Sequence, residues 1–329
     1  LKDSAAAGAD AFIISDPGVF CLAKETAPGT AVHVSTQANT TNSEAVKFWR
    51  GLGAERIILA RECSLADIRR IRESVPDETE LEAFVHGAMC VAYSGRCLLS
   101  QYLLKRGANQ GDCAQPCRYM YHVVEETRPG VYLPVTEDEG GTALFSASDL
   151  CMAEYLPELT GAGIGSFKIE GRMKTSFYVG LTTHIYRKAI DTFCADPRRY
   201  AEMKKFYAAD LEKSSHRGAA GFSTGFYFGA PVPPGEAQLA QGGVFAGVVL
   251  DYDSETGIAA VEQRNKFSAG DELEIFCGSG ASFTQIAEGM RNENGALIES
   301  APHPKQRVFL KMSRPVEAYD LIRKVTPAP

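Results

Sequence analysis

Short apolar runs alternate with helix-like segments through the first 195 residues of this 329-residue chain. The runs are rich in β-branched and aromatic residues and cover 11–15, 31–35, 56–60, 81–86, 143–148 and 165–170. Helices are expected between them, for example at 42–52 behind an Asn42 cap and at 64–74 behind a Ser64 cap. Strands that alternate with helices build βαβ units, so the pattern predicts an α/β fold around a parallel sheet.

The number of these runs narrows the fold further. A (β/α)8 barrel needs eight strands, and six runs of this kind are present. The opening segment, LKDSAAAGADAFIIS, is typical of the end of a helix that enters a strand, and it has no initiator Met. We therefore expect an incomplete chain and a TIM-like (β/α) barrel that lacks its first two βα units. An open, doubly wound sheet is the alternative.

The pattern changes twice in the second half of the chain. Residues 176–194 have the apolar spacing of an amphipathic helix, and residues 196–240 are irregular and rich in Gly, Pro and aromatics. Short alternating strands follow from residue 241. We therefore predict a barrel domain over 1–195, a connector over 196–240, and a small β-barrel domain over 241–329.

Composition limits the class of protein. The chain is 45% hydrophobic and 23% charged, and no apolar stretch is long enough to span a membrane. A net charge of −7 argues against a general nucleic-acid coat protein, although one basic face is compatible with it. Nine cysteines without a secretion signal indicate a reducing compartment, so we expect a cytoplasmic location. The oligomeric state is not indicated.

Four cysteines lie in a glycine-rich segment at 87–118. Cys90, Cys97, Cys113 and Cys117 have the spacing C-x6-C-x15-C-x3-C, which differs from the paired C-x2-C of zinc ribbons. Four converging thiolates can hold an iron–sulfur cluster or a zinc ion, and free structural thiols are the third alternative. The other five cysteines lie in or beside apolar runs, so we expect them to be buried: Cys21, Cys63, Cys151, Cys194 and Cys277.

Polar residues stand where the predicted strands end, which in a TIM barrel is the catalytic face. His86 and Glu82 are four residues apart on one strand and share a face with Phe84, so we expect both to point into the barrel. Cations surround one carboxylate in KIEGRMK, which suits a bound anion, with Arg172 as the expected clamp. The proposed catalytic residues are His86, Glu82, Lys168, Glu170 and Arg172.

A second set of residues is predicted to bind substrate. Gln37 and Asn39 follow the second strand and Arg61 follows the third. His216 and Arg217 belong to the aromatic loop SHRGAAGFSTGFYFG, which ends at Gly229. Its aromatic side chains can stack on RNA bases or fasten the loop to the rest of the chain. The predicted substrate-binding residues are Gln37, Asn39, Arg61, Lys174, His216 and Arg217.

Several motifs together resemble one family. The string E-x-F-V-H-G-A-M-C-x6-C-L-L-S from Glu82 to Ser100 is similar to the signature of the U32 family. VSTQANTTNSEAVKFW (34–49), FKIEGRMK (167–174) and the aromatic loop match as well. U32 was named for collagenase-like peptidases, whereas its better understood members are iron–sulfur proteins that hydroxylate tRNA, ribosomal RNA or a quinone precursor.

The resemblance is greatest to the branch that forms 5-hydroxyuridine in tRNA. It implies a [4Fe–4S] cluster on Cys90, Cys97, Cys113 and Cys117, tRNA as partner, the wobble uridine as target, and the dicarboxylate prephenate as oxygen source. Two alternatives remain. One is a U32-type peptidase, for which no H-E-x-x-H zinc motif is found. The other is a non-catalytic scaffold in which zinc holds the cysteine segment.

Overall fold

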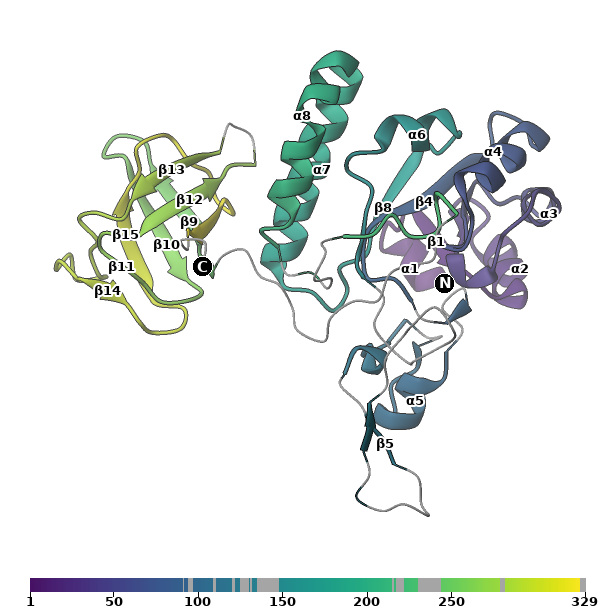
Figure 1. Cartoon of the computed structure of the whole chain (residues 1–329), viewed down its shortest axis with the longest axis horizontal. Helices are drawn as coiled ribbons and strands as arrows, with labels where there is room; N and C mark the ends of the chain where they lie inside the picture. The colour runs from purple at the N-terminus through teal and green to yellow at the C-terminus, as the bar shows by residue number, and fades with distance from the viewer. Residues whose placement is uncertain are drawn as a thin grey trace. The chain divides into compact units, whose positions relative to one another are not determined.

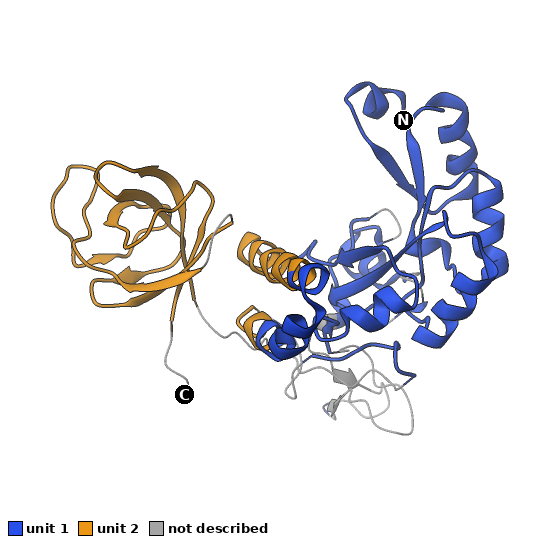
Figure 2. Ribbon diagram, turned by 90° about the horizontal axis from the view of Figure 1, so that it is seen from above, with its two compact units in different colours: residues 1–173, 192–208, 216–239 blue, residues 174–191, 209–215, 240–329 orange. Residues whose placement is uncertain are grey.

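The structure of the chain is a computed structural model. It describes residues 1–90, 92–93, 97–108, 111–119, 122–124, 130, 132–134, 148–214, 216, 222–229, 244–278 and 282–325. The chain divides into two compact units (Figure 2). The first unit consists of residues 1–173, 192–208 and 216–239, and the second of residues 174–191, 209–215 and 240–329.

A parallel sheet forms the centre of the first unit (Figure 1). Its parallel strands are β1 (Ala11–Ile14), β2 (Ala31–Val34), β3 (Arg56–Ile58), β4 (Glu80–Gly87) and β8 (Ser166–Ile169). They are hydrogen-bonded in the order β1-β2-β3-β4-β8. The short strand β7 (Leu150–Cys151) pairs with the end of β4 in the antiparallel direction. Strand β4 is buried on both faces, since all of its residues after Glu80 are buried.

Helices follow the strands in the predicted alternation. Those of the first unit are α1 (Lys2–Ala6), α2 (Pro17–Thr26), α3 (Ser43–Gly51), α4 (Leu65–Ser74) and α6 (Leu156–Gly161). The beginning and middle of α8 (Pro197–Leu211) also belong to this unit, so the prediction of an irregular connector from residue 196 is wrong for this helix. Asn42 caps α3 by accepting the Ala45 N–H at 2.9 Å, and Ser64 forms a capping box with Asp67 on α4. Both predicted helix starts are therefore confirmed.

The parallel α/β architecture is confirmed, whereas a closed barrel is not formed by the described strands. Strand β1 pairs with β2 only, and β8 pairs with β4 only. Residues 143–147 of the fifth predicted strand lie outside the described residues. The nearest strand that the structure contains is β7, which runs against β4 rather than along it.

The cysteine segment continues from the end of β4. It contains α5 (Leu99–Leu104) and the 3-10 turn η4 (Pro116–Arg118). Strands β5 (His122–Val124) and β6 (Tyr132–Pro134) pair with each other after it. Another 3-10 turn, η1 (Thr36–Ala38), follows β2, so the segments after β2 and β4 both supply residues beyond the sheet.

The second unit is built around an antiparallel sheet with the order β13-β12-β16-β9-β10-β15. Its strands are β9 (Val244–Asp253), β10 (Ile258–Gln263), β11 (Phe267–Ser268), β12 (Glu272–Phe276), β13 (Phe283–Ile286), β14 (Ser300–Ala301), β15 (Arg307–Lys311) and β16 (Leu321–Lys324). Helix α7 (Ser176–Ala195) contributes its first four turns, and Phe177 stacks on Phe245 at 4.9 Å between ring centres. Buried Phe177, Leu181 and Ile185 confirm the predicted apolar face of this helix.

No helix among the described residues has the length and apolar character needed to cross a membrane.

Candidate functional site

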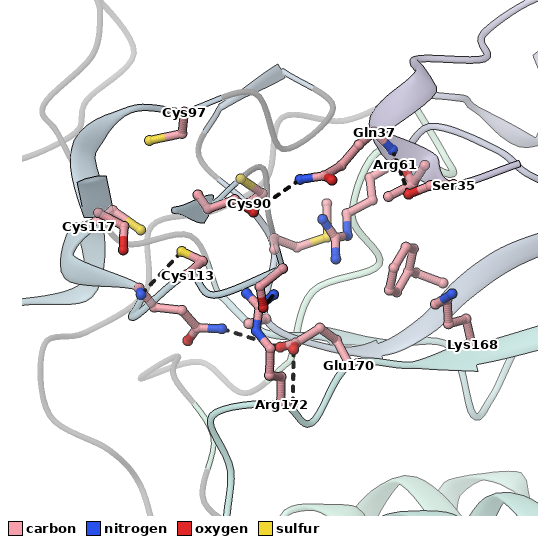
Figure 3. Close-up of a pocket in the computed structure, with 18 of the residues that line it drawn as sticks. Ser35, Gln37, Arg61, Cys90, Cys97, Cys113, Cys117, Lys168, Glu170 and Arg172 are labelled. Atoms are coloured by element: carbon pink, nitrogen blue, oxygen red, sulfur yellow. Dashed lines mark hydrogen bonds between the residues drawn. The ribbon is translucent and has the colours of Figure 1, made fainter. Parts of the chain in front are cut away.

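One cavity lies at the carboxyl ends of the parallel strands, with a volume of about 630 Å³ (Figure 3). The segments after β1, β2, β3, β4 and β8 all contribute to its wall. Its polar and sulfur-bearing lining residues include Ser15, Ser35, Gln37, Arg61, Cys90, Cys97, Cys113, Gln115, Cys117, Lys168, Glu170 and Arg172. Side chains meet here because the carboxyl ends of parallel strands share one edge of a sheet.

The four clustered cysteines all line this cavity. Each is half-buried and forms no disulfide, and Figure 3 shows their side chains on one side of the cavity, with Lys168 on the opposite side. The backbone N–H of Leu99 donates to Cys97 Sγ and that of Gln115 to Cys113 Sγ, each at 3.3 Å. Donors of this kind stabilise thiolates, which are the form that binds metal.

The environment of Cys90 also fits a metal ligand. Burial raises the pKa of the Cys90 thiol, whereas a backbone N–H bond from Ala92 and the charge of Arg61 lower it. Cys97 and Cys113 are close enough to add to the raised value. Within the described residues, no three His, Cys, Asp or Glu side chains are close enough to hold a single metal ion. Four thiols thus line the cavity, and three of them accept a backbone N–H bond, from Ala92, Leu99 and Gln115.

Hydrogen bonds fasten the cysteine segment to the strand ends. Gln37 Nε2 donates to the Ala108 carbonyl at 3.3 Å, and Arg172 Nη1 donates to the Gly111 carbonyl at 2.7 Å. Gln115 Nε2 donates to Glu170 Oε2 at 3.3 Å, and Glu170 Oε1 accepts the Arg172 N–H at 3.0 Å. Arg172 was predicted to clamp a ligand carboxylate. In the structure its side chain binds the segment that carries Cys113.

Gly87 makes a close approach possible beside the cysteines. Its φ is +106°, and a Cβ atom at this position would stand 2.2 Å from the carbonyl oxygen of Glu170. Only glycine satisfies both conditions, since a side chain is disfavoured at positive φ and would overlap the neighbouring backbone. Gly87 therefore allows β4 to lead into the cysteine segment while it touches the end of β8.

Arg61 is a half-buried cation in the cavity wall. Its guanidinium carbon lies 3.9 Å from the centre of the Phe84 ring, a cation–π contact. Among the described residues its Nε is buried and has no hydrogen-bond partner. Burial lowers the pKa of Arg61, and the charges of Cys90, Glu170 and Glu62 offset only part of this effect. The sequence predicted Arg61 as a binding residue, and the structure places it in the cavity wall.

Glu82 belongs to a different environment, below the cavity. Its carboxylate forms ion pairs with Arg56 at 3.2 Å and with Lys168 at 3.2 Å, and it accepts the Ser166 hydroxyl at 2.8 Å. It is not among the residues that line the cavity, whereas Lys168 is. Glu82 thus shares its negative charge between two cations of the sheet. This is a structural role, whereas the sequence predicted a catalytic one.

His86 lies elsewhere than predicted. It is buried and packs against Phe222 at 5.0 Å between ring centres, and the cavity wall does not include it. The pairing of β4 with β8 shifts register between Phe84 and His86, so the two-residue alternation that linked Glu82, Phe84 and His86 is broken there. His216 packs against the same phenylalanine, since its ring centre lies 4.5 Å from that of Phe222.

The remaining predicted residues are distributed differently. Asn39 ends η1 with a left-handed φ of 65° and is not part of the cavity wall. Lys174 belongs to the second unit, where its Nζ lies 4.7 Å from the Tyr178 ring centre. Arg217 lies outside the described residues. Gln115 and Ser100 were not predicted; the hydroxyl of Ser100 accepts the Ala114 N–H at 3.1 Å, and only their positions among the cysteines signalled them.

The five other cysteines only partly match the expectation of burial. Cys63, Cys151 and Cys277 are buried, and desolvation raises the pKa of Cys63 to about 12 and that of Cys277 to about 11. Cys21 and Cys194 are exposed, so the prediction is wrong for them. Both lie on helices, where an apolar neighbour in sequence points to another face.

Comparison with known families decides the relationship of the chain. The sequence model of peptidase family U32 matches residues 1–236, and that of the U32 C-terminal domain matches residues 242–323. The chain belongs to peptidase family U32. The signature that predicted this family, from Glu82 to Ser100, contains two of the four cysteines in the cavity wall of the U32 unit.

Similar U32 proteins carry names from RNA modification. tRNA hydroxylation protein P1 of Bacillus subtilis is 37% identical over 98% of this chain and 75% of its own length. The 23S rRNA 5-hydroxycytidine C2501 synthase of Escherichia coli is 34% identical over 68% of this chain and 33% of its own length. A crystal structure of the C-terminal domain of a Geobacillus thermoleovorans protein, described as a U32 peptidase, has 47% identity and a TM-score of 0.25; it covers 25% of this chain and 93% of that one.

Proposed function

We propose that this U32 chain is an RNA-modifying enzyme that hydroxylates tRNA. The observation that carries the proposal is one cavity that is lined by four cysteines without disulfides and by the cation Arg61. The similarity to a tRNA hydroxylation protein over nearly the whole chain adds to it. The finer proposal is 5-hydroxyuridine formation at the wobble position, with prephenate as the oxygen source.

The proposed cofactor is a [4Fe–4S] cluster on Cys90, Cys97, Cys113 and Cys117. Support comes from the shared cavity, the N–H···S bonds and the absence of disulfides at all nine cysteines, which suits a reducing cytoplasm. A cluster places four irons between its thiolates, so it suits ligands spread around a cavity better than a single zinc ion does. When bound, such a cluster supplies electron transfer or a coordination site.

The proposed architecture of the catalytic unit is a TIM-like (β/α) barrel. Its support is the run of parallel strands, each followed by a helix or the cysteine segment, and the cavity at their carboxyl ends. An experimental structure of the protein with tRNA tests this proposal. Closure of the sheet through further parallel strands is the expected result, and an open sheet with helices on both faces would contradict it.

Peptidase activity is the second candidate, because the family bears that name. No histidine lines the described cavity, so its cysteines lack a base there for a Cys–His nucleophile. Residues 221–225, GFSTG, have the G-x-S-x-G pattern of serine hydrolases. Ser223 is buried, however, and its Oγ accepts the Gly225 N–H at 3.2 Å in a turn rather than in a strand–helix elbow. Gelatin hydrolysis by the purified protein is the measurement for this alternative.

Anaerobic purification with iron and sulfide analysis tests the cofactor, and nucleoside analysis of tRNA tests the reaction. We expect iron and sulfide that are lost in Cys90→Ser and Cys113→Ser but kept in Cys194→Ser, a matched exposed thiol outside the cavity. We also expect 5-hydroxyuridine in tRNA only with the metal-loaded protein. One zinc per chain would overturn the cluster, and unmodified tRNA together with hydroxylated ribosomal RNA would move the substrate to the ribosome.

A further inference from the structure

Arg61 is a half-buried cation that forms no ion pair and no side-chain hydrogen bond among the described residues. Its Nε is fully buried without a hydrogen-bond partner, and the face of Phe84 contacts its guanidinium. Buried charges are ordinarily paired, because taking a charge out of water costs more free energy than most single contacts return. A protein that keeps such a residue at the wall of a cavity has prepared a place for an anion.

The other cations of the cavity wall are already engaged. Lys168 forms an ion pair with Glu82 at 3.2 Å, and Arg172 donates to the Gly111 carbonyl at 2.7 Å. Both could have served as the anion site that the sequence predicted, but their charges hold the sheet and the cysteine segment together. Of the three cations that line the described cavity, Arg61 is the one with neither an ion pair nor a side-chain hydrogen bond among the described residues.

The walls near Arg61 indicate the kind of anion. Phe84 covers one face of the guanidinium, so a ligand has to approach the edge, where a planar fork of N–H donors matches the two oxygens of a carboxylate. Apolar side chains complete the cavity, among them Ile13, Met89 and Ile169. A volume of about 630 Å³ is the size of a pocket for a small organic molecule.

We propose that Arg61 is the anion-binding residue of the U32 cavity and that it receives the carboxylate of a small organic acid with an apolar body. This inference rests on the proposed function, since the acid would be a co-substrate that binds beside the cysteines. Glu170 lines the same cavity, so the net positive charge near Arg61 is small and suits a single carboxylate group better than a doubly charged phosphate. The position of Arg61 within the cavity favours a small molecule over the backbone of RNA.

Calorimetric titration of the metal-loaded protein tests the assignment. The ligands are prephenate, its single-carboxylate relative phenylpyruvate, and inorganic phosphate. We expect prephenate to bind, and Arg61→Met to raise its Kd at least tenfold, with a smaller rise for Arg61→Lys, which keeps the charge and loses the fork. The matched control is Arg70→Met, which removes an exposed arginine from α4 and should leave the Kd unchanged.

The possible outcomes separate this inference from the proposed function. Equal affinity in Arg61→Met and the unchanged protein would overturn it, as would stronger binding of phosphate than of either carboxylate, or no carboxylate binding at all. tRNA hydroxylation that proceeds normally in Arg61→Met would overturn the inference and leave the function standing. Carboxylate binding that depends on Arg61, in a protein that leaves tRNA unmodified, would support the inference and overturn the proposed function. A melting temperature of Arg61→Met at or above that of the unchanged protein shows that lost binding is not unfolding.

Discussion

Two regions of one sheet differ in how their charged side chains are paired. In the middle of β4, Glu82 lies between Arg56 and Lys168 and also accepts the hydroxyl of Ser166, so each charge there has a partner. At the carboxyl end, Arg61 stacks on Phe84 without an ion pair among the described residues. Removing one partner of a buried ion pair destabilises a fold, because the other charge is left uncompensated, whereas removing an unpaired charge does not have this cost. The comparison predicts which residues matter for stability and which for chemistry.

The largest effect is expected at the cavity mouth, from Gly87→Ala. A Cβ atom at φ +106° is strained and would overlap the Glu170 carbonyl, so β4 and β8 have to separate. We expect a loss of about 3 kcal/mol in the free energy of unfolding, measured by urea denaturation. Gly8→Ala is the control, because Gly8 has a φ of +87° and nothing within 4 Å of the added Cβ. Equal losses in both variants would show that strain alone, and not the contact with Glu170, explains the effect.

The paired region is tested by Glu82→Gln. This change removes the negative charge shared by Arg56 and Lys168, whose side chains are 27% and 28% exposed and can reach water only in part. We expect a loss of about 2 kcal/mol in the free energy of unfolding. Glu80→Gln is the matched control, because its more exposed ion pair with Arg56 should contribute under about 1 kcal/mol. A loss no larger than that of the control would remove the contrast between the two regions.

Lys168→Met tests whether the charge of Lys168 stabilises the sheet or binds a ligand in the cavity. Its ammonium pairs with Glu82 but also lines the cavity, 5.6 Å from the centre of the Phe84 ring. If its charge is committed to Glu82, stability falls by about 1 kcal/mol, because Arg56 and Ser166 still satisfy the carboxylate. Thermal unfolding measures the loss. A protein of unchanged stability that no longer binds prephenate would place Lys168 with Arg61 instead.

Arg61→Met is expected to act in the opposite direction on stability. Methionine fills much of the same space without a charge to desolvate, although the contact with Phe84 is lost. We expect stability to stay equal or to rise by up to about 1 kcal/mol in the protein without ligand. A loss of more than about 1 kcal/mol in the same denaturation assay would mean that Arg61 is held by structure and not for binding.

The smallest effect concerns pH. Burial lowers the pKa of His33 on β2, and Arg56 adds to this while Glu82 opposes it. A histidine whose pKa is lower in the folded protein binds fewer protons there, so stability falls as pH decreases through 6.5 towards the folded value. His33→Gln should flatten this part of the profile of melting temperature between about pH 7.5 and 5.5. A profile identical to that of the unchanged protein would show that His33 contributes nothing.

Much of the site could be predicted because its residues follow chemical rules that are local in sequence. Four cysteines between Cys90 and Cys117 and the polar residues after each strand indicate the cavity wall from the sequence alone. The role of each cation could not be predicted in this way. Arg61, Lys168 and Arg172 are alike in sequence. Their neighbours decide that Lys168 pairs with Glu82, that Arg172 donates to the Gly111 carbonyl, and that Arg61 has no ion pair within the described part of the chain.

The positions of His86 and Glu82 show the same limit. Strict alternation along a strand would direct both into the barrel, but the register shift beside Val85 breaks the alternation. A bulge depends on the pairing of two strands that are distant in sequence, so it cannot be predicted from a local pattern. Cys21 and Cys194 were misplaced for a related reason, since helix faces rather than neighbouring residues decide burial.

The alternation of strands and helices, the helix caps at Asn42 and Ser64, the four-cysteine segment and the U32 family can all be predicted from the amino-acid sequence. These depend on periodicity, on capping chemistry and on spacing, which are properties of neighbouring residues. Which charges are paired depends on the folded chain, because pairing needs side chains from β3, β4 and β8 at one point. The free energy of a buried charge depends on those partners, and so does the difference between a structural ion pair and a binding site.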